Sequence, residues 1–175
     1  KNPHLQNRIV NYLELIMKNY KYKGVFIVDT NAKISLAVGY ESSTIGEATY
    51  SFIKESMQRK SVTMSPIYYC DKCTDIHLDV FAPLFAGEKL IGGMNFRIDP
   101  EEFLFPLIQS WPTPSKSSES LLIRKDGNEV VFINQLRHKD NTVLKLRLKI
   151  DSSHMHIPAV AAAYGTEGIM EGIDY

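Results

Sequence analysis

The sequence has no surplus of either charge, since 20 Lys and Arg residues balance 20 Asp and Glu residues over 175 residues. A general nucleic-acid binder is expected to carry a basic surplus, because its affinity comes largely from neutralising phosphates. Long apolar runs are also missing. Stretches such as Val80–Ala86 have the length of a strand, far short of the roughly 20 residues that cross a bilayer. The composition therefore argues against a nucleic-acid partner and against a membrane span within these residues.

Cysteine is scarce, and Cys70 and Cys73 are the only pair. No second pair exists to complete a structural zinc site, and His77 is the only nearby third ligand. Four interpretations are open: a redox motif, half of a zinc site, a disulfide, or two free thiols. Thioredoxin-like chemistry needs this spacing at a helix N-terminus, whereas here it falls in a turn between two predicted strands. We expect a disulfide, which suits an extracytoplasmic compartment, and no metal or cofactor.

Enzyme motifs are missing as well. The sequence has no Walker loop, no GxGxxG, no GxSxG and no HExxH. Cysteine, histidine and aspartate are present, but at no spacing that places a nucleophile beside a base, although folding can assemble such a group from distant residues. We therefore expect no catalytic residues and no enzymatic activity in this chain.

The first hundred residues predict an α+β fold. Apolar residues recur at three- and four-residue spacing over residues 1–23, which indicates a long helix, with Asn2-Pro3 at its start. Strands are expected at about 24–29, 33–38, 62–69, 76–85 and 89–98. A second helix, capped by Ser43 or Thr44, separates the first two strands from the last three. This order predicts a five-stranded antiparallel sheet with helices on its faces.

Prolines then interrupt the pattern over residues 104–119, which read as a linker. Strands resume at 120–125 and 129–134, joined by a turn at Asp126-Gly127-Asn128. A strictly alternating segment follows at 142–150, then a helical segment at 152–164. We therefore divide the chain into a helix at 1–23, a module at 24–103, the linker at 104–119, and a second, incomplete module at 120–175.

Three segments carry a family resemblance: Phe105–Ser115, Glu119–Gly127 and Leu136-Arg137-His138. They resemble the double-Cache, or tandem PAS-like, extracytoplasmic sensor domains of bacterial and archaeal histidine kinases, diguanylate cyclases and related receptors. Gly168–Tyr175 is similar to the segment that leads into the last strands of the family's membrane-proximal module. Gly24–Asp29 and Ala82-Pro83-Leu84 fit the membrane-distal module. The resemblance covers nearly the whole chain.

The resemblance implies a non-catalytic sensor at the cell membrane. Such domains lie outside the cytoplasm between two transmembrane helices and bind a small molecule, usually in the distal module. They often form homodimers through the first helix, and they pass the signal to a cytoplasmic kinase or cyclase. The opening Lys1-Asn2-Pro3-His4 shows neither Met nor a signal peptide, which we interpret as a fragment excised from such a receptor.

One departure from the family leaves the ligand class open. The amino-acid-binding branch carries an Arg-x-Trp-Tyr motif before its third strand, and Arg59-Lys60-Ser61-Val62 lacks the aromatic pair. Arg97 stands where that branch has an aspartate on its last distal strand. The sequence therefore does not support capture of an α-amino group.

A polar cluster is the candidate ligand site. If Ala86–Glu88 is a three-residue turn, Asp79 lies opposite Asn95 and His77 lies opposite Arg97. All four side chains then share one face of the sheet. Met64, Pro66 and Tyr68 are expected to join that face, and the Tyr50 hydroxyl to reach the ligand. Arg97 suits bidentate binding of a carboxylate. The alternative is a diagonal ion pair between Asp79 and Arg97 on a solvated face.

The hypothesis is thus an extracytoplasmic small-molecule sensor whose ligand contacts Tyr50, Tyr68, His77, Asp79, Asn95 and Arg97. It would act through a ligand-biased shift between two conformations. Two alternatives stay open: a redox or metal-dependent enzyme that uses Cys70 and Cys73, and a PAS-like interaction domain without a ligand. Two reactive thiols after denaturation without reductant would argue against the disulfide.

Overall fold

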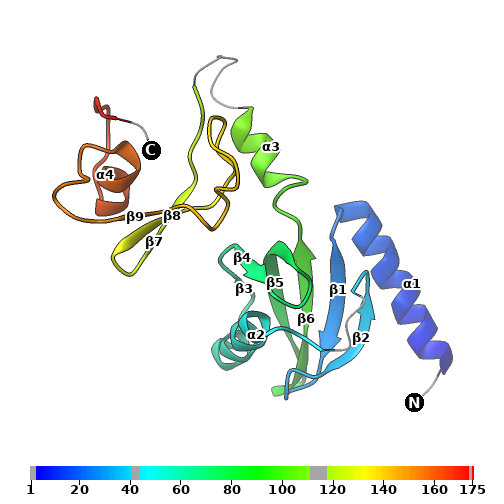
Figure 1. The fold of residues 1–175 in the computed structure, drawn as a ribbon. Helices are drawn as coiled ribbons and strands as arrows, with labels where there is room; N and C mark the ends of the chain where they lie inside the picture. Colours follow the sequence, from blue (N-terminus) through cyan, green and yellow to red (C-terminus); the bar gives the residue numbers. More distant parts are fainter. Residues whose placement is uncertain (1–2, 41–43, 111–117, 174) are drawn as a thin grey trace. The chain divides into compact units, whose positions relative to one another are not determined.

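The protein is described here by a computed structural model, which covers residues 3–40, 44–110, 118–173 and 175 (Figure 1). These residues form two compact units, Lys1–Pro100 and Glu101–Tyr175. Both combine helices with antiparallel strands, which confirms the α+β prediction. No helix in the described part of the chain is both long enough and apolar enough to cross a membrane.

The first unit is built on an antiparallel sheet of six strands in the order β2-β1-β6-β5-β3, with β4 also paired to β5. The strands are β1 (Gly24–Val28), β2 (Ile34–Val38), β3 (Thr63–Met64), β4 (Tyr68–Cys70), β5 (Asp75–Ala86) and β6 (Lys89–Ile98). The single strand expected at 62–69 is therefore two short strands. Between them lies Pro66, which has no backbone N–H to donate to a sheet.

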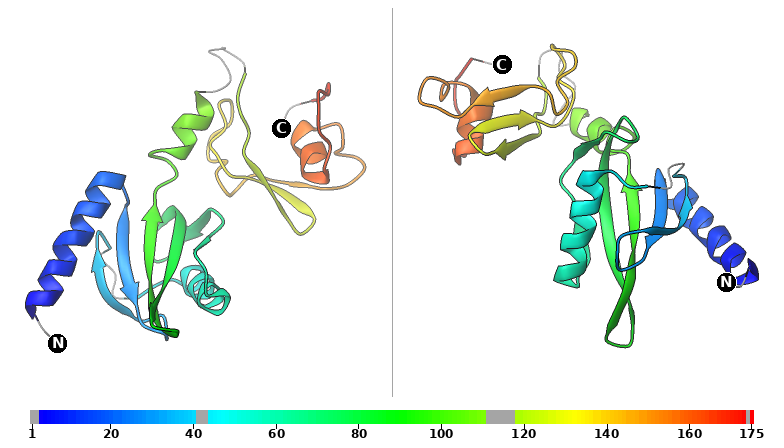
Figure 2. Two further views of the ribbon diagram at one scale, coloured as in Figure 1. Left: turned by 180° about the vertical axis from the view of Figure 1, so that it is seen from behind. Right: turned by 60° about the horizontal axis from the view of Figure 1, so that its bottom comes forward.

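Two helices cover opposite faces of this sheet (Figures 1 and 2). Helix α2 (Glu47–Arg59) packs Ile53 against Phe26 and Phe81, and all three side chains are fully buried. Helix α1 (Pro3–Tyr20) packs Leu13 against Val25 on the other face. The alternation of Val25 and Phe26 along β1 therefore divides the unit into two apolar layers.

The helix ends differ slightly from the sequence prediction. Helix α1 ends at Tyr20, and Lys21 has a left-handed φ of 55°, so the helix is shorter than the predicted 1–23. The N-cap of α2 is Gly46, with no side-chain capping bond, rather than Thr44; Ser43 and Asn2 lie outside the described residues.

The β5–β6 hairpin has a register two residues away from the predicted one. Ala86 pairs with Lys89, so the turn contains two residues, and a bulge between Leu84 and Phe85 shifts the pairing beyond it. Asp79 therefore lies opposite Arg97, and Phe81 lies opposite Asn95. The predicted pairs Asp79–Asn95 and His77–Arg97 are wrong. Their shared face is nonetheless kept, because a shift of two residues leaves side chains on the same side of a sheet.

The second unit contains a three-stranded antiparallel sheet, β7-β8-β9, formed by Ile123–Asp126, Glu129–Phe132 and Arg147–Lys149. Helix α4 (Pro158–Tyr164) packs Val160 against Val130 and Phe132 of this sheet. Buried Asn134 supports the sheet by accepting a bond from the Leu122 N–H at 2.6 Å and donating to the Ser120 carbonyl at 3.0 Å.

Three predictions for the second unit need correction. The segment 104–119 contains a short helix, α3 (Leu104–Gln109), while Trp111–Ser115 lies outside the described residues. The strand expected at 142–150 is shorter, because Leu146 N–H bonds back to the Thr142 carbonyl at 2.9 Å and forms a turn. The last helix begins at Pro158 rather than near Ser152, since proline suits a first helical turn.

Candidate functional site

Four of the predicted site residues meet at one end of the first sheet, on the face that α2 covers. His77 and Asp79 come from β5, Arg97 comes from β6, and Tyr68 comes from β4, where it pairs with His77. His77, Asp79 and Arg97 are 2%, 0% and 1% exposed. The cluster is therefore buried. The alternative interpretation is right that Asp79 and Arg97 form an ion pair, but wrong that the pair is diagonal and lies on a solvated face.

Arg97 and Asp79 form a bidentate ion pair at the centre of the cluster. Arg97 Nε donates to Asp79 Oδ1, and Nη2 donates to Oδ2, both at 3.0 Å. The backbone of Asp79 is also fixed, because its N–H donates to Ser65 Oγ at 2.9 Å. This pairing occupies the guanidinium edge that the sequence prediction assigned to a ligand carboxylate, so only the Nη1 side of Arg97 faces elsewhere.

Hydroxyl groups extend this network. Arg97 Nη2 lies 3.1 Å from Thr49 Oγ1 and 3.0 Å from the Tyr68 hydroxyl, which also donates to Asp79. Burial and the Asp79 charge raise the pKa of Tyr68 above its ordinary value. Burial opposes the charge of Arg97, but the hydrogen bonds and charge of Asp79 outweigh it and raise the pKa of Arg97. Both groups therefore keep their protons at physiological pH.

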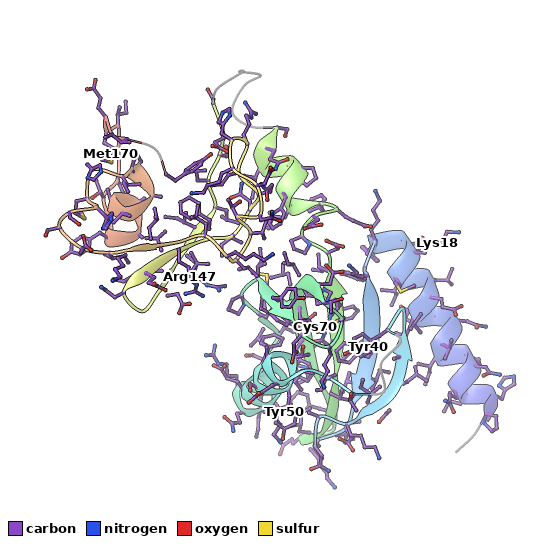
Figure 3. The ribbon with its side chains drawn as sticks, in the orientation of Figure 1. Lys18, Tyr40, Tyr50, Cys70, Arg147 and Met170 are labelled. Atoms are coloured by element: carbon purple, nitrogen blue, oxygen red, sulfur yellow. A yellow bond between two sulfur atoms is a disulfide. The ribbon has the colours of Figure 1, made fainter. Side chains whose placement is uncertain are left out.

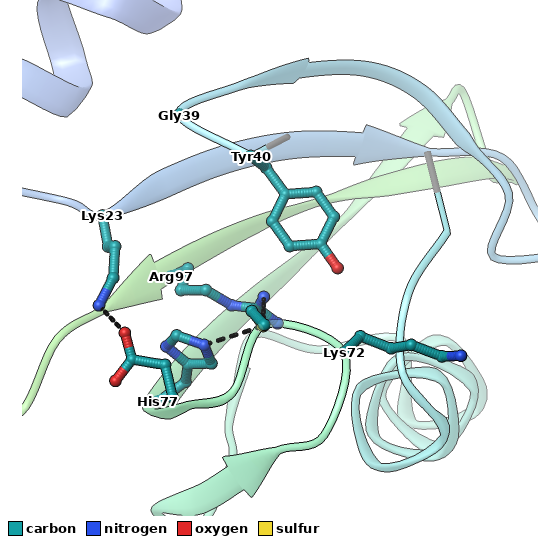
Figure 4. Close-up of a pocket in the computed structure, with 8 residues that line it drawn as sticks. Lys23, Gly39, Tyr40, Lys72, His77 and Arg97 are labelled. Atoms are coloured by element: carbon teal, nitrogen blue, oxygen red, sulfur yellow. Dashed lines mark hydrogen bonds and ion pairs between the residues drawn. The ribbon is translucent and has the colours of Figure 1, made fainter. Parts of the chain in front are cut away.

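Two aromatic rings cover the guanidinium. The Arg97 Cζ atom lies 4.9 Å from the centre of the Tyr40 ring and 5.6 Å from that of Phe26. Such cation–π contacts are worth more when the cation is desolvated, as it is here. The Tyr40 hydroxyl donates to the Thr44 carbonyl at 3.0 Å, which holds its ring over Arg97 (Figure 4).

A disulfide between Cys70 and Cys73 closes the turn from β4 to β5 (Figure 3). Cys73 Sγ lies 3.1 Å from His77 Nε2 and 3.4 Å from Arg97 Nη1. Folding therefore brings a cysteine beside a histidine, although their spacing in the sequence gave no catalytic pattern. Burial and the Arg97 charge lower the pKa of His77 to about 4, so its imidazole is neutral at pH 7.

A pocket of about 360 Å³ opens beside the cluster (Figure 4). It is lined by Lys23, Gly39, Tyr40, Lys72, Cys73, Asp75, His77 and Arg97. Lys23 is paired with Asp75 and, at 2.9 Å, with Asp99. The buried Nδ1 atom of His77 has no hydrogen-bond partner among the described residues. The pocket thus presents polar donors beside the buried Arg97–Asp79 pair, whose two charges cancel.

Several predicted residues do not join the cluster. Tyr50 is 44% exposed on α2 (Figure 3), whereas its neighbour Thr49 is fully buried. Asn95 is buried on the same sheet face as Arg97, but it does not line the pocket, and neither its Nδ2 nor its Oδ1 atom has a partner in the described structure. Met64 and Pro66 are exposed and do not join it either.

The sequence analysis missed several participants, among them Thr49, Tyr40, Lys23 and Lys72. Thr49 had a detectable signal, because it lies four residues before Ile53 on the buried face of α2. Tyr40, Lys23 and Lys72 lie outside helices and strands, where no periodicity marks their direction.

Searches by sequence match no family model and no curated protein. Solved structures are similar. The sensory domain of the Campylobacter jejuni chemoreceptor Tlp3 with isoleucine bound has 16% identity and a TM-score of 0.53, over 64% of this chain and 46% of that one. The ligand-binding domain of Mlp24 with asparagine has 11% identity and a TM-score of 0.57, over 82% of this chain and 59% of that one.

A third similar structure is the ligand-binding domain of the Pseudomonas aeruginosa PAO1 amino acid chemoreceptor PctC in complex with GABA. Its identity is 13% and its TM-score 0.55, over 79% of this chain and 61% of that one. This chain has the fold of receptor sensor domains. The resemblance to Cache-type domains is confirmed at the level of the fold. The chain spans about half the length of the Tlp3 domain, at 46%.

Proposed function

We propose that the first unit is a non-catalytic sensing module whose pocket binds a small molecule that carries a carboxylate. The observation that carries this proposal is that two cationic side chains, Arg97 and Lys72, line the pocket with donors, Nη1 and Nζ, that have no carboxylate partner among the described residues. Arg97 Nη1 has the Cys73 sulfur as its partner, and the Lys72 amine at the exposed rim has no ion-pair or hydrogen-bond partner among the described residues. A carboxylate in the pocket would contact Nη1, and the flexible Lys72 side chain, whose amine is directed away from Arg97 in Figure 4, would turn toward it.

The acidic groups near the pocket are already engaged. Asp79 is held by Arg97 and Tyr68, and Asp75 is held by Lys23 and by the Ile76 N–H at 2.8 Å. Neither carboxylate is free to capture an ammonium group without giving up a cation. The ligands named for the three similar structures, isoleucine, asparagine and GABA, all contain a carboxylate. All three also carry an amino group, and it is the engagement of Asp79 and Asp75 that favours the carboxylate as the group that this pocket recognises.

The proposal extends to the place of this chain in a receptor. The chain would be the extracytoplasmic part of a membrane signalling protein, a histidine kinase or cyclase, with flanking transmembrane helices and an output domain outside these residues. Residues 24–103 would be the distal module, 104–119 the linker and 120–175 the proximal module. Ligand binding would shift a two-state equilibrium by its difference in affinity for the two states.

Helix α1 would form the homodimer contact in this receptor. Ile9, Tyr12 and Leu15 are 36%, 65% and 58% exposed, and their three-residue spacing places them in a row along the helix that leads away from the buried Leu13. An apolar row of this kind on a helix is suited to packing against a second copy.

Four compounds of matched size test the ligand class: butyrate, 4-aminobutyrate, butyramide and butylamine. Calorimetry should detect binding of butyrate and 4-aminobutyrate, and the melting temperature should rise with their concentration. Butyramide and butylamine should leave it unchanged. Binding of butylamine or butyramide without binding of butyrate would contradict the proposed carboxylate.

Two lysine variants provide the matched comparison. Lys72→Gln should weaken carboxylate binding by about 2- to 5-fold, since an exposed ion pair contributes up to about 1 kcal/mol. Lys89→Gln changes another exposed lysine, at the far end of β6 and outside the pocket, and should bind as the parent does. Equal affinities of all three proteins would exclude Lys72 from the site.

A further inference from the structure

The disulfide turn and His77 form a group whose chemistry the proposed sensing function does not use. Cys70, Cys73 and His77 each offer one ligand atom, and these atoms all lie within 4.8 Å of one another. A four-coordinate zinc ion holds its sulfur and nitrogen ligands roughly 3.5–3.8 Å apart. Opening the S–S bond therefore needs only small movements to bring the three atoms to ligand distances.

We propose that reduction of the Cys70–Cys73 disulfide creates a site for a zinc-class divalent cation, held by Cys70, Cys73 and His77, with its fourth position open to the pocket. The disulfide and the metal site exclude each other, because both use the same two sulfurs. The state of this turn would then report the thiol redox condition or the soft-metal level outside the cell.

The chemistry balances with a dithiol as reductant. The dithiol gives two electrons and two protons to the S–S bond of Cys70 and Cys73, which becomes two thiols, and the dithiol is converted to its own disulfide. Binding of a divalent cation then displaces the two thiol protons to solvent. The two thiolates neutralise the two charges of the ion.

The surroundings of the three ligands favour such a site. His77 presents Nε2 to the Cys73 sulfur at 3.1 Å, and its Nδ1 is buried without a partner among the described residues. Arg97 Nη1, 3.4 Å from the same sulfur, favours a thiolate over a thiol, while its own charge is balanced by Asp79. Cys73 and His77 both line the pocket, so water or an anion can reach the fourth position.

Cobalt(II) is the probe, because its absorption reports both thiolate ligands and coordination number. The 175-residue chain would be reduced with dithiothreitol, desalted without oxygen and titrated with Co²⁺ alone. We expect one equivalent to bind, with thiolate charge-transfer bands and strong visible bands of a four-coordinate ion. Zn²⁺ should displace it, and the oxidised chain should show none of these bands. A reduced chain without them would overturn the proposal.

Variants separate this site from simple chelation by two thiols. His77→Gln should weaken Co²⁺ binding at least about tenfold, since even outer-shell partners of metal ligands are worth 10–100-fold. His156→Gln, which changes an exposed histidine of the second unit, should bind as the parent does. Cys70→Ser with Cys73→Ser should abolish the thiolate bands. Unchanged binding by His77→Gln, with a folded circular dichroism spectrum, would refute the histidine ligand.

Azide tests the open position. This small anion coordinates cobalt directly, so it should shift the visible bands of the bound ion if the fourth position faces the pocket. A spectrum that azide leaves unchanged would refute the open position. These measurements need only the metal and azide, so failure of the carboxylate proposal would not affect them.

Discussion

At the scale of single residues, the buried pair of Arg97 and Asp79 defines what the pocket can do. Both charges are almost fully removed from water, and each satisfies the other through two hydrogen bonds. Breaking such a pair by removing one partner generally costs about 3–5 kcal/mol, because the other charge stays buried. Arg97 is thus a structural residue first, and only its Nη1 side is available to a ligand.

His77 makes the stability of the first unit depend on pH. Its pKa falls from 6.5 to about 4 on folding, so on acidification the unfolded chain binds the proton first. Neutral His77 leaves the free energy of unfolding at its full value above pH 6.5, and this value decreases as the pH falls from 6.5 toward 4. The free energy of unfolding decreases by about 1.4 kcal/mol per pH unit over this range, which amounts to roughly 2 kcal/mol by pH 5. His77→Gln should lack this part of the decrease.

Urea denaturation of the oxidised chain with EDTA, at pH 7.5 and pH 5, measures the difference. His138→Gln changes an exposed histidine of the second unit and should keep the decrease of the parent chain. The same decrease in the His77→Gln protein would show that His77 is not the responsible group.

At the scale of elements, the close packing of β1, β5 and β6 requires glycine at position 93. A Cβ atom there would lie 1.9 Å from Cζ of the buried Phe81 ring. Gly93→Ala should therefore destabilise the first unit by about 1–3 kcal/mol, the usual range for overpacking. Adding Phe81→Leu should recover part of this loss, so that the double variant is more stable than the sum of the two single changes predicts.

Gly87→Ala is the control for this prediction. Gly87 has a positive φ of 62° but nothing within 4 Å of an added Cβ, so its cost is backbone strain of about 1 kcal/mol without any dependence on Phe81. Thermal unfolding of the single and double variants gives the comparison. A Gly93→Ala protein as stable as the parent would show that Phe81 moves aside freely.

The sequence predicted the elements of the first unit well, because strand alternation and helical spacing are local. It predicted the shared face of His77, Asp79 and Arg97 despite a wrong register, since alternation survives a shift of two residues. It placed Tyr50 rather than Thr49 at the site, because a helix turns by 100° per residue and a one-residue error changes the face.

The rest of the site depends on geometry that no local pattern carries. The bulge between Leu84 and Phe85 set the actual partner of Asp79, and nothing in the spacing marked it. Tyr40 covers Arg97 from a loop, and Cys73 reaches His77 across a turn. Loop side chains have no periodicity, so their direction is fixed only by the folded structure.

At the scale of the whole molecule, two units each enclose apolar residues of their own. The cluster around Phe26 draws its members from residues 26–90, and the cluster around Phe132 draws its members from residues 121–175. Both phenylalanines are fully buried. Chains of this kind unfold in more than one step when the units do not share a core.

We therefore expect calorimetry to resolve two transitions that respond separately to matched substitutions. Phe26→Ala should lower the melting temperature of one transition and Phe132→Ala that of the other, because a buried Phe→Ala change typically removes roughly 3–5 kcal/mol of the free energy of unfolding. A carboxylate bound to the pocket should raise the melting temperature of the transition that Phe26→Ala affects and leave the melting temperature of the other transition unchanged. If both substitutions lowered one common transition, the two units would fold as a single cooperative body, and the sensing pocket would depend on the second unit for its stability.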